Sequence, residues 1–219
     1  LPDGDAPADP LPLAADRAGK VLGFDEAGNP VALSQLDKSA DTVMATGATT
    51  ARTLASIMAD AVNPFFWGAR GDGQGDDTLA LNAAAAHAAA NGKPLMLVGT
   101  FRCTGTVTIP VGVPLLVMRG RIVSTVGGAA ALEIGSRGQR NRSFVGSGIR
   151  VVRETVTDWQ DEAEVGIRIY NLDAGYVEIV EATGFTIGAQ TLGASTFGVE
   201  DSTFVLGRLV DCRIGLDIR

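Results

Sequence analysis

After Pro94, a short pattern recurs that restricts the fold more than any other feature of the chain. It consists of glycine, an apolar residue, a polar residue and a second apolar residue, and it starts at Gly148, Gly166, Gly184 and Gly215. The segment Ala131-Leu132-Glu133-Ile134 has the same form without the glycine, and residues 179–187 match 209–218 if one insertion is allowed. Alternating apolar and polar residues are typical of strands with one buried face. Their recurrence predicts a repeat architecture.

We therefore predict a mainly β fold in which short strands stack as a solenoid, with small aliphatic side chains pointing inward. Strands are expected at 95–98, 106–109 and 165–170. The spacing between patterns does not determine the length of one coil. One full turn takes either 18 residues or about 30, in which case 18 residues is the distance from one side of the coil to the next. A β-sandwich is the alternative, but it favours Asn-Gly or Asp-Gly hairpin turns, which are scarce after residue 95.

A helix is expected just before this β region. Asp76-Asp77-Thr78 supplies N-cap oxygens, Leu79 to Ala90 propagate the helix, and Asn91-Gly92 favours a left-handed stop. The first coil of a solenoid exposes strand edges and apolar interior unless something covers them. We interpret residues 77–91 as that cover, with the glycines and aspartates of 71–77 shaping the loop that leads into it.

The N-terminal 45 residues are predicted to form an extended segment followed by a hairpin. Residues 1–18 contain four prolines, which favours an extended chain. Residues 20–33 are expected to form two short strands joined by a turn at 25–30. An isolated hairpin is marginally stable in water, so this one requires a partner, either another copy or a different protein.

A helical segment is predicted next, over 46–62. Leu54, Ile57, Met58, Ala61 and Val62 follow helical spacing from about residue 49. A helix of about 14 residues is near the limit of independent stability, so its apolar stripe needs a cover. The pattern is equally compatible with two covers for this stripe. The helix packs on its own domain, or it forms a coiled-coil-like seam with identical chains.

Composition excludes several function classes. The 219 residues carry a net charge of −7, which disfavours binding to a nucleic-acid backbone. No apolar run is long enough to cross a bilayer, and no signal peptide is visible. The two cysteines cannot form a disulfide framework or a zinc site. The first residue is not Met and the last lies within a repeat, so we expect the sequence to belong to a longer chain.

Residues 51–110 resemble the opening segment of bacteriophage tailspike and tail-fibre proteins with a pectate-lyase-like right-handed β-helix. The matching residues are Trp67-Gly68-Ala69, Gly71-Asp72-Gly73, Asp76-Asp77-Thr78, Leu81, Gly99-Thr100-Phe101 and Thr108-Ile109-Pro110. The sequence departs from the family at Asn63-Pro64-Phe65-Phe66, where an aliphatic, a charged and an aromatic residue are usual. This departure puts in doubt how the preceding helix meets the β-helix.

The resemblance implies a homotrimer in the phage tail. Residues 1–45 would bind a tail or baseplate protein of the virion, 46–62 would form a neck, and 63–219 would begin the β-helix. It also implies binding to a bacterial surface polysaccharide, often with depolymerisation by a glycoside hydrolase or lyase activity. No cofactor, metal, nucleic acid or membrane insertion is expected. A structural virion adaptor without sugar chemistry and a free polysaccharide lyase or hydrolase of the same fold are the alternatives.

Other motifs favour structural roles. The glycine-rich segment 68–75 lacks the Gly-Lys-Ser/Thr of a nucleotide loop, and its aspartates would repel phosphate. Arg70-Gly71-Asp72 matches a cell-adhesion tripeptide that arises often by chance. Asp72, Asp76 and Asp77 lack calcium-loop spacing. His87, the only histidine, has no nucleophile partner, so we expect a packing or surface role.

Carboxylates are the remaining catalytic candidates, because glycoside hydrolysis needs two of them, one with a raised pKa. The candidates are Asp158, Asp161 and Glu162 in the polar loop 154–164, and Glu178, Glu181 and Asp211 at expected coil corners. Glu181 and Asp211 align in the repeat and are expected to stack. Trp159 is a candidate for stacking on a sugar ring. Acids at corners also keep a solenoid soluble, which is the structural alternative.

Overall fold

The computed structural model describes residues 10–18, 20–25, 27–33, 42–44, 49–53, 56–57, 59–155, 158–193 and 198–219. The chain divides into two compact units, Leu1–Ile57 and Met58–Arg219, each described by itself. Among the described residues, no helix combines the length and the apolar character that a membrane crossing requires.

Unit 1 contains the predicted hairpin. Its elements are α1 (Ala14–Arg17), β1 (Val21–Phe24), β2 (Pro30–Leu33), β3 (Thr42–Val43) and β4 (Arg52–Thr53). β1 and β2 pair antiparallel, and the Asp25 carboxylate closes the turn by accepting the backbone N–H groups of Ala27 and Asn29 at 2.9 and 2.8 Å.

Two expectations for this region are wrong. The segment expected to be extended over 1–18 contains helix α1, because the last proline is Pro12 and places no restriction beyond Leu11; residues 1–9 lie outside the described part. The helical neck expected over 46–62 is interrupted, since Arg52 and Thr53 form β4 and pair with β3. Val62 is buried beside Leu95, and its N–H donates to the Pro94 carbonyl at 2.8 Å. Ser56 and Ile57, between these pairings, are helical, so the expectation holds for only part of its range.

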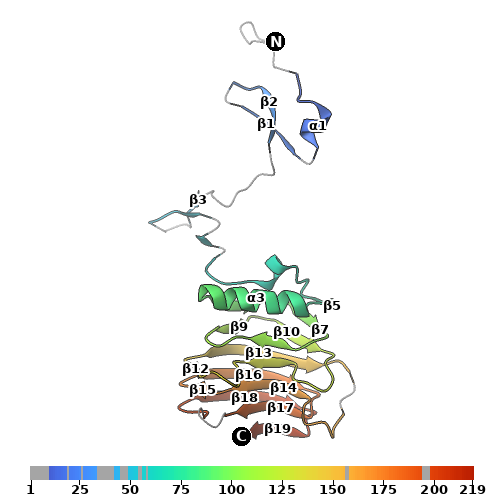
Figure 1. Ribbon diagram of the computed structural model, residues 1–219, viewed down its shortest axis with the longest axis vertical. Coiled ribbons are helices and arrows are strands. Elements are labelled where there is room, and N and C mark those ends of the chain that lie inside the picture. The colour runs from blue at the N-terminus through green and yellow to red at the C-terminus, as the bar shows by residue number, and fades with distance from the viewer. Residues whose placement is uncertain are drawn as a thin grey trace. The chain divides into compact units, whose positions relative to one another are not determined.

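Unit 2 is mainly β, with parallel sheets (Figure 1). It opens with the 3-10 turn η1 (Pro64–Trp67), and α3 (Thr78–Asn91) follows the first strand. One sheet has eight strands, β5 (Asp72–Asp76), β6 (Leu95–Leu97), β7 (Thr100–Cys103), β9 (Leu115–Val117), β10 (Arg121–Ser124), β13 (Val145–Arg153), β16 (Tyr176–Thr183) and β18 (Thr203–Val210). The other has five, β8 (Val107–Ile109), β11 (Leu132–Ile134), β14 (Val165–Tyr170), β17 (Ile187–Leu192) and β19 (Ile214–Ile218). A short third sheet joins β12 (Asn141–Arg142) to β15 (Leu172–Asp173).

Successive strands alternate between the two large sheets. β10 is followed by β11, β13 by β14, β16 by β17 and β18 by β19, and each new strand lies parallel to the previous strand of its own sheet. An antiparallel sandwich is therefore excluded for this part of the chain. Stacked partners are separated by unequal intervals, 35 residues between Glu133 and Arg168, 22 between Arg168 and Gln190, and 27 between Gln190 and Asp217.

These intervals correct the repeat alignment made from the sequence. Glu181 pairs with Arg208, and Asp211 lies in a turn with φ +50°, so the expected stacking of Glu181 on Asp211 is wrong. The Gly184 pattern falls on the corner between β16 and β17. Loops of unequal length separate the strands, so a fixed offset misaligns them.

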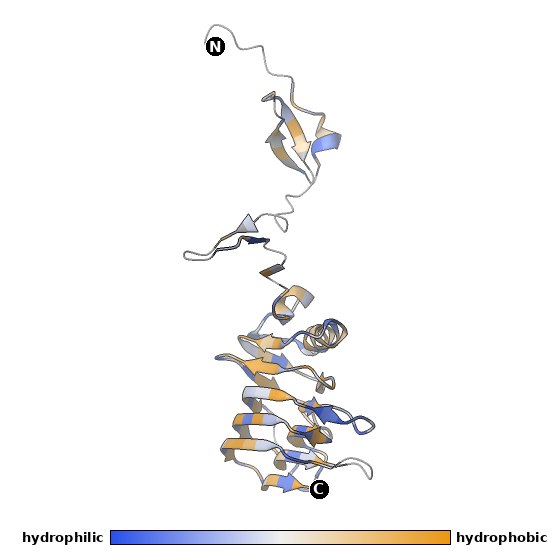
Figure 2. Ribbon diagram, turned by 90° about the vertical axis from the view of Figure 1, so that its left-hand side faces the viewer, coloured by the Kyte–Doolittle hydropathy of each residue, from blue (hydrophilic) through white to orange (hydrophobic). Residues whose placement is uncertain are grey.

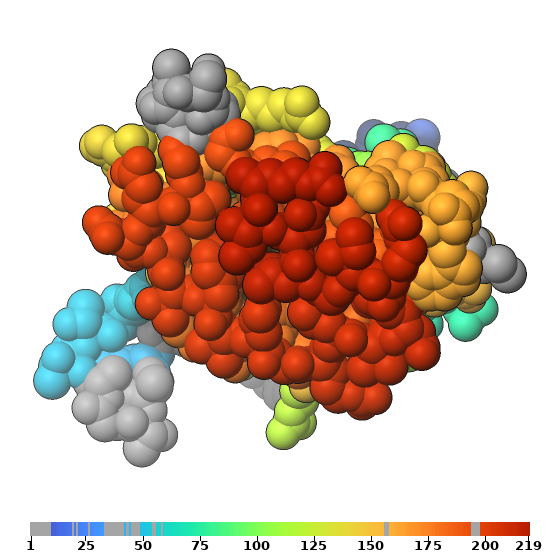
Figure 3. All heavy atoms as spheres, turned by 90° about the horizontal axis from the view of Figure 1, so that it is seen from below, coloured from blue at the N-terminus to red at the C-terminus, as the bar shows by residue number. Residues whose placement is uncertain are grey.

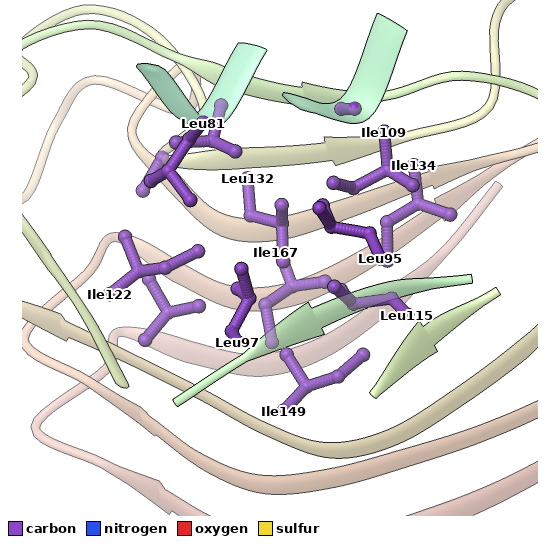
Figure 4. Packing of buried hydrophobic residues seen from close by; sticks show 14 of the residues in the cluster. Leu81, Leu95, Leu97, Ile109, Leu115, Ile122, Leu132, Ile134, Ile149 and Ile167 are labelled. Carbon is purple, nitrogen blue, oxygen red and sulfur yellow. The ribbon is translucent and has the colours of Figure 1, made fainter. Parts of the chain in front are cut away.

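The buried faces of the two sheets share one core (Figure 4). Leu132, Ile167 and Ala189 form a continuous row across neighbouring strands, and all are buried. Close backbone approach requires glycine at Gly148 and Gly166, which open two of the patterns, and also at Gly188. A Cβ on Gly166 would lie 2.6 Å from the Gly188 carbonyl oxygen, and one on Gly188 would lie 2.9 Å from that of Gly215.

α3 lies over the first strands of unit 2 and contacts β6, β7 and β8 (Figure 2). Leu81, Ala84, Ala85 and Ala88 form its buried side, and Gly92 ends it at φ +59°. At the opposite end, β18 and β19 form much of the surface (Figure 3), where Val205, Leu206, Leu216 and Ile218 are exposed.

Candidate functional site

The polar loop between β13 and β14 is held by a buried ion pair. Arg153 Nη2 lies 2.7 Å from Glu164 Oε1, and Glu164 Oε2 accepts the backbone N–H of Asp158 at 3.0 Å. Thr186 Oγ1 donates to the Asp158 carbonyl at 2.8 Å. These contacts fix both ends of the segment 158–164, which carries Trp159 with 42% of its surface exposed. The indole is therefore presented to solvent by an ordered loop.

The acids of this loop are engaged in local contacts. Asp158 Oδ1 accepts the N–H of Gln160 at 3.0 Å, and Asp161 Oδ1 accepts that of Ala163 at 2.8 Å. Glu162 lies 3.0 Å from both Arg213 and Arg219, and hydrogen bonds from these arginines lower its pKa. Such contacts stabilise turns and loop ends.

The candidates on β16 and after β18 have separate hydrogen-bond partners or none described. Glu178 accepts the Ser147 hydroxyl at 2.6 Å and the Gly148 N–H at 3.0 Å, and these bonds lower its pKa. A general acid needs the opposite shift. Glu181 accepts the Thr183 hydroxyl at 3.3 Å, and Asp211 is exposed in its turn. None of these contacts joins two of the candidate carboxylates.

A row of polar side chains crosses the outer face of the five-stranded sheet. Strand register places Glu133, Arg168, Gln190 and Asp217 side by side. Arg168 donates to Glu133 at 3.1 Å and to Gln190 at 2.8 Å, and Gln190 donates to Asp217 at 2.7 Å. We call these four residues the polar ladder. Arg168 offsets the charge of Glu133, and Asp217 lies 2.8 Å from Arg219 outside the ladder. Glu133 keeps 26% of its side chain exposed, whereas Gln190 is buried.

A cavity of about 280 Å³ lies beside one end of the polar ladder. It is lined by Arg137, Tyr170, Asn171, Leu192 and Gly193, and we call it the Tyr170 cavity. The Tyr170 hydroxyl donates to Glu133 at 3.0 Å, and the Arg137 guanidinium lies 5.7 Å from the centre of the Tyr170 ring. Asn171 Nδ2 donates to the carbonyls of Ser136, Arg137 and Gln139 at 2.8 to 3.1 Å, which fixes the loop that carries Arg137.

The cavity and ladder combine an aromatic wall, a guanidinium and several amide and carboxylate groups. Such a set suits the hydroxyl groups and apolar ring faces of a sugar, and the volume is near the lower end for small-molecule sites. Within the described ranges, no group of three or more His, Cys, Asp or Glu residues is arranged to hold a metal ion.

Sequence reasoning missed this site, although a signal was present. Glu133, Arg168 and Asp217 are the polar members of the patterns that start at Ala131, Gly166 and Gly215. Stacking those patterns in one sheet would have aligned the three side chains. Gln190 was not recognised as a member of the row, because the pattern that contains it ends in Thr191 where an apolar residue is expected.

The fold and these surfaces define a protein with parallel β-sheets and with polar and aromatic groups arrayed on its outer side. No family model matches the chain, and no match among curated proteins was found either. Among solved structures it is similar to the Dettilon tailspike protein gp208, with 19% identity, a TM-score of 0.49, and coverage of 73% of this chain and 30% of that one.

It is also similar to ORF18 of Geobacillus virus E2, with 16% identity, a TM-score of 0.41, and coverage of 86% of this chain and 43% of that one. This chain thus spans less than half the length of either structure. At these identities, and with TM-scores below 0.5, neither likeness assigns a function to it.

Proposed function

We propose that this chain is part of a phage tailspike or tail-fibre protein, and that unit 2 begins a right-handed parallel β-helix of the pectate-lyase-like kind. The alternation of strands between two parallel sheets supports this fold. The position of α3 over β6, β7 and β8 supports its role as the cover of the first coil.

The observation that carries the proposal is the local structure of the segment that resembles tailspikes. The Asp77 carboxylate accepts the N–H groups of Arg70 and Gly71 at 2.7 and 3.2 Å, and Asp76 binds both Thr78 and Thr104. The two aspartates thereby join the glycine-rich loop, the start of α3 and the end of β7. These contacts explain why aspartates are needed at 76 and 77 in the segment that resembles tailspikes.

The proposed ligand is a bacterial surface polysaccharide, bound at the Tyr170 cavity and by Trp159. The ordered loop around Trp159 supports stacking on a sugar ring, since an aromatic face held in place loses little entropy on binding. No catalytic step is assigned to Asp158, Asp161, Glu178, Glu181 or Asp211. The described contacts of the first four are hydrogen bonds from backbone N–H groups and hydroxyls, and none of these bonds joins two of the carboxylates. The proposed activity is attachment to the polysaccharide.

We further propose that the N-terminal region through residue 45 anchors the chain to a tail or baseplate protein, and that the chain forms homotrimers. The β1–β2 hairpin supports an anchoring role, because a two-stranded hairpin needs a partner to be stable. Light scattering on the purified chain tests the oligomer, and a monomer would contradict it.

The glycan role is tested with immobilised capsular and O-antigen polysaccharides and the purified full chain. We expect binding to a subset of the panel, and about tenfold weaker binding for Trp159→Ala, which removes the ring face. Phe66→Ala, which truncates another exposed aromatic of unit 2, is the matched control and should bind as the native chain does. Failure to bind any polysaccharide would overturn the proposal. New reducing ends or unsaturated products would instead reveal depolymerisation.

A further inference from the structure

Three arginines lie on the outer face of the eight-stranded sheet, away from the polar ladder. Arg150 of β13 pairs with Glu181 of β16, and Glu181 pairs with Arg208 of β18. Arg121 of β10 and Arg150 directly precede Ile122 and Val151, which pair with each other. Figure 1 shows β10, β13, β16 and β18 stacked in this order. Neighbouring strands are about 4.8 Å apart, so the register places these residues along a line across the strands. We call Arg121, Arg150 and Arg208 the arginine row.

The side chains of the arginine row point to solvent. All three residues are exposed, whereas Ile122 and Val151 next to them are 1% and 0% exposed. Within the described ranges, none of the three guanidinium groups forms an ion pair. By contrast, Arg102 on the same face lies 2.8 Å from Glu154. The row is therefore positive, with Glu181 as the one acid within it.

Glu181 lies opposite Arg150 and Arg208 and offsets part of their charge, but Arg121 has no acid opposite it in the neighbouring strands β7 and β13. Arg121 and Arg150 occupy adjacent positions on neighbouring strands, where like charges repel. Protection of a sheet edge does not explain them, because β10 and β13 lie inside the sheet, between β16 and β7. A bound anion would relieve the repulsion.

A second row runs beside the first, two residues further along each strand. It consists of Val123, Val152, Thr183 and Val210, all partly exposed and paired across the strands. The face therefore combines a line of guanidinium groups with a line of mostly aliphatic side chains. Neither row holds an aromatic residue on which a nucleobase could stack.

We propose that the arginine row binds a linear acidic polysaccharide, laid across the strands with its carboxylates on the guanidinium groups and its ring faces on the aliphatic row. The inference rests on the proposed function in taking a glycan as ligand, but it names a different surface and a chemical class. Arginine suits this task because its planar fork binds a carboxylate through two hydrogen bonds. Nucleic acid is disfavoured as the ligand because neither row offers an aromatic side chain for base stacking.

The test uses the full chain and polygalacturonate, with dextran as the neutral polymer and an oligothymidylate as the nucleic acid. We expect the native chain to bind polygalacturonate in a salt-dependent manner and to bind the other two at least about tenfold more weakly. The double variant R121Q/R150Q should lose at least about tenfold in affinity for polygalacturonate. Adding R208Q should weaken binding further. The control R17Q/K20Q removes the same charge from unit 1 and should bind as the native chain does.

Equal weakening by R121Q/R150Q and R17Q/K20Q would overturn the proposal, because net charge alone would then explain binding. Tighter binding of oligothymidylate than of polygalacturonate would also overturn it, in favour of nucleic acid. Circular dichroism of each variant checks that the fold is kept. If the native chain binds neutral bacterial polysaccharides but not polygalacturonate, this inference fails and the proposed function stands. If it binds polygalacturonate but no bacterial polysaccharide, this inference stands and the proposed function fails.

Discussion

Arg153 and Glu164 form an ion pair that is almost completely removed from solvent, with side chains 3% and 5% exposed and a 2.7 Å separation. Glu164 lies at the end of the loop that carries Trp159, and Arg153 lies at the end of β13, where its Nη1 also donates to the Val126 carbonyl at 2.7 Å. The pair therefore connects the loop to the strand before it. Burying two charges is costly, so each depends strongly on the other.

Replacing Glu164 by Gln should destabilise the chain by about 3–5 kcal/mol, because the buried Arg153 guanidinium would lose its counter-charge. Urea denaturation gives the free energy of unfolding. R213Q, which removes an exposed pair with Glu162, is the control and should cost less than about 1 kcal/mol. The double variant R153M/E164L should be less destabilised than the sum of R153M and E164L. Additive effects would contradict the coupling.

Asp76 should make the stability of unit 2 depend on pH. Burial raises the pKa of its carboxyl, but hydrogen bonds from Thr104 and Thr78 outweigh this and lower the pKa well below 3.8. Because the folded-state pKa is depressed, the carboxylate stabilises the fold above pH 4, and this contribution is lost as the pH falls through the folded-state pKa.

Asp76→Asn should therefore cost about 1–2 kcal/mol at pH 7, after allowance for solvent screening, and less at pH 3. Urea denaturation between pH 3 and pH 7 measures the difference. Asp72→Asn is the comparison variant, since the Asp72 carboxylate is exposed and accepts the Gln74 N–H at 2.9 Å, and its pKa is also lowered, so its effect should be smaller but of the same sign. A cost of D76N that is the same at pH 3 and pH 7 would contradict the lowered pKa of Asp76.

Local signals in the sequence predicted much of the fold. The hairpin at 20–33, the helix ending at Gly92 and the strand Val165–Tyr170 each follow from nearby residues, namely a proline and glycine turn, a cap and an alternating pattern. The helix predicted over 46–62 is present at Ser56 and Ile57 but not at Arg52, Thr53 or Val62, and the pairing of Val62 with Leu95 depends on a strand 33 positions away. Long-range pairing of this kind leaves no local trace.

The candidate site was harder to predict, because it depends on register. Glu133 and Arg168 are 35 residues apart, and only the sheet brings them together. Asp158 and Asp161, which the sequence singled out, cap backbone N–H groups in turns. Glu178 and Glu181 lie within strand β16, so the expectation that they lie at coil corners is wrong. The sequence shows which residues are polar, but the register of the strands decides which polar side chains lie next to one another.

The conformation of the loop next to the Tyr170 cavity should depend on the side-chain amide of Asn171. Asn171 Nδ2 donates to three carbonyls of residues 136–139, and Asn171 has φ +49°, which asparagine tolerates better than most residues. Asn171→Asp keeps the shape and the backbone preference but points a carboxylate at carbonyl oxygens. We expect N171D to cost about 2–3 kcal/mol in urea denaturation and to speed hydrogen exchange in 136–140. Unchanged exchange would contradict the anchoring role.

Gly148 should tolerate no side chain, because a Cβ there would collide with the Val117 carbonyl oxygen of the neighbouring strand β9. Its φ of +72° is also unfavourable for alanine. Gly148→Ala should therefore cost about 3 kcal/mol or more of unfolding free energy. Gly138→Ala is the matched control, since a Cβ at Gly138 meets no atom within 4 Å and its φ is not positive. The Gly148 N–H also donates to Glu178, so the clash should displace that carboxylate and raise its lowered pKa. NMR titration of Glu178 measures this, and an unchanged pKa together with native stability would contradict the close approach of β9 and β13.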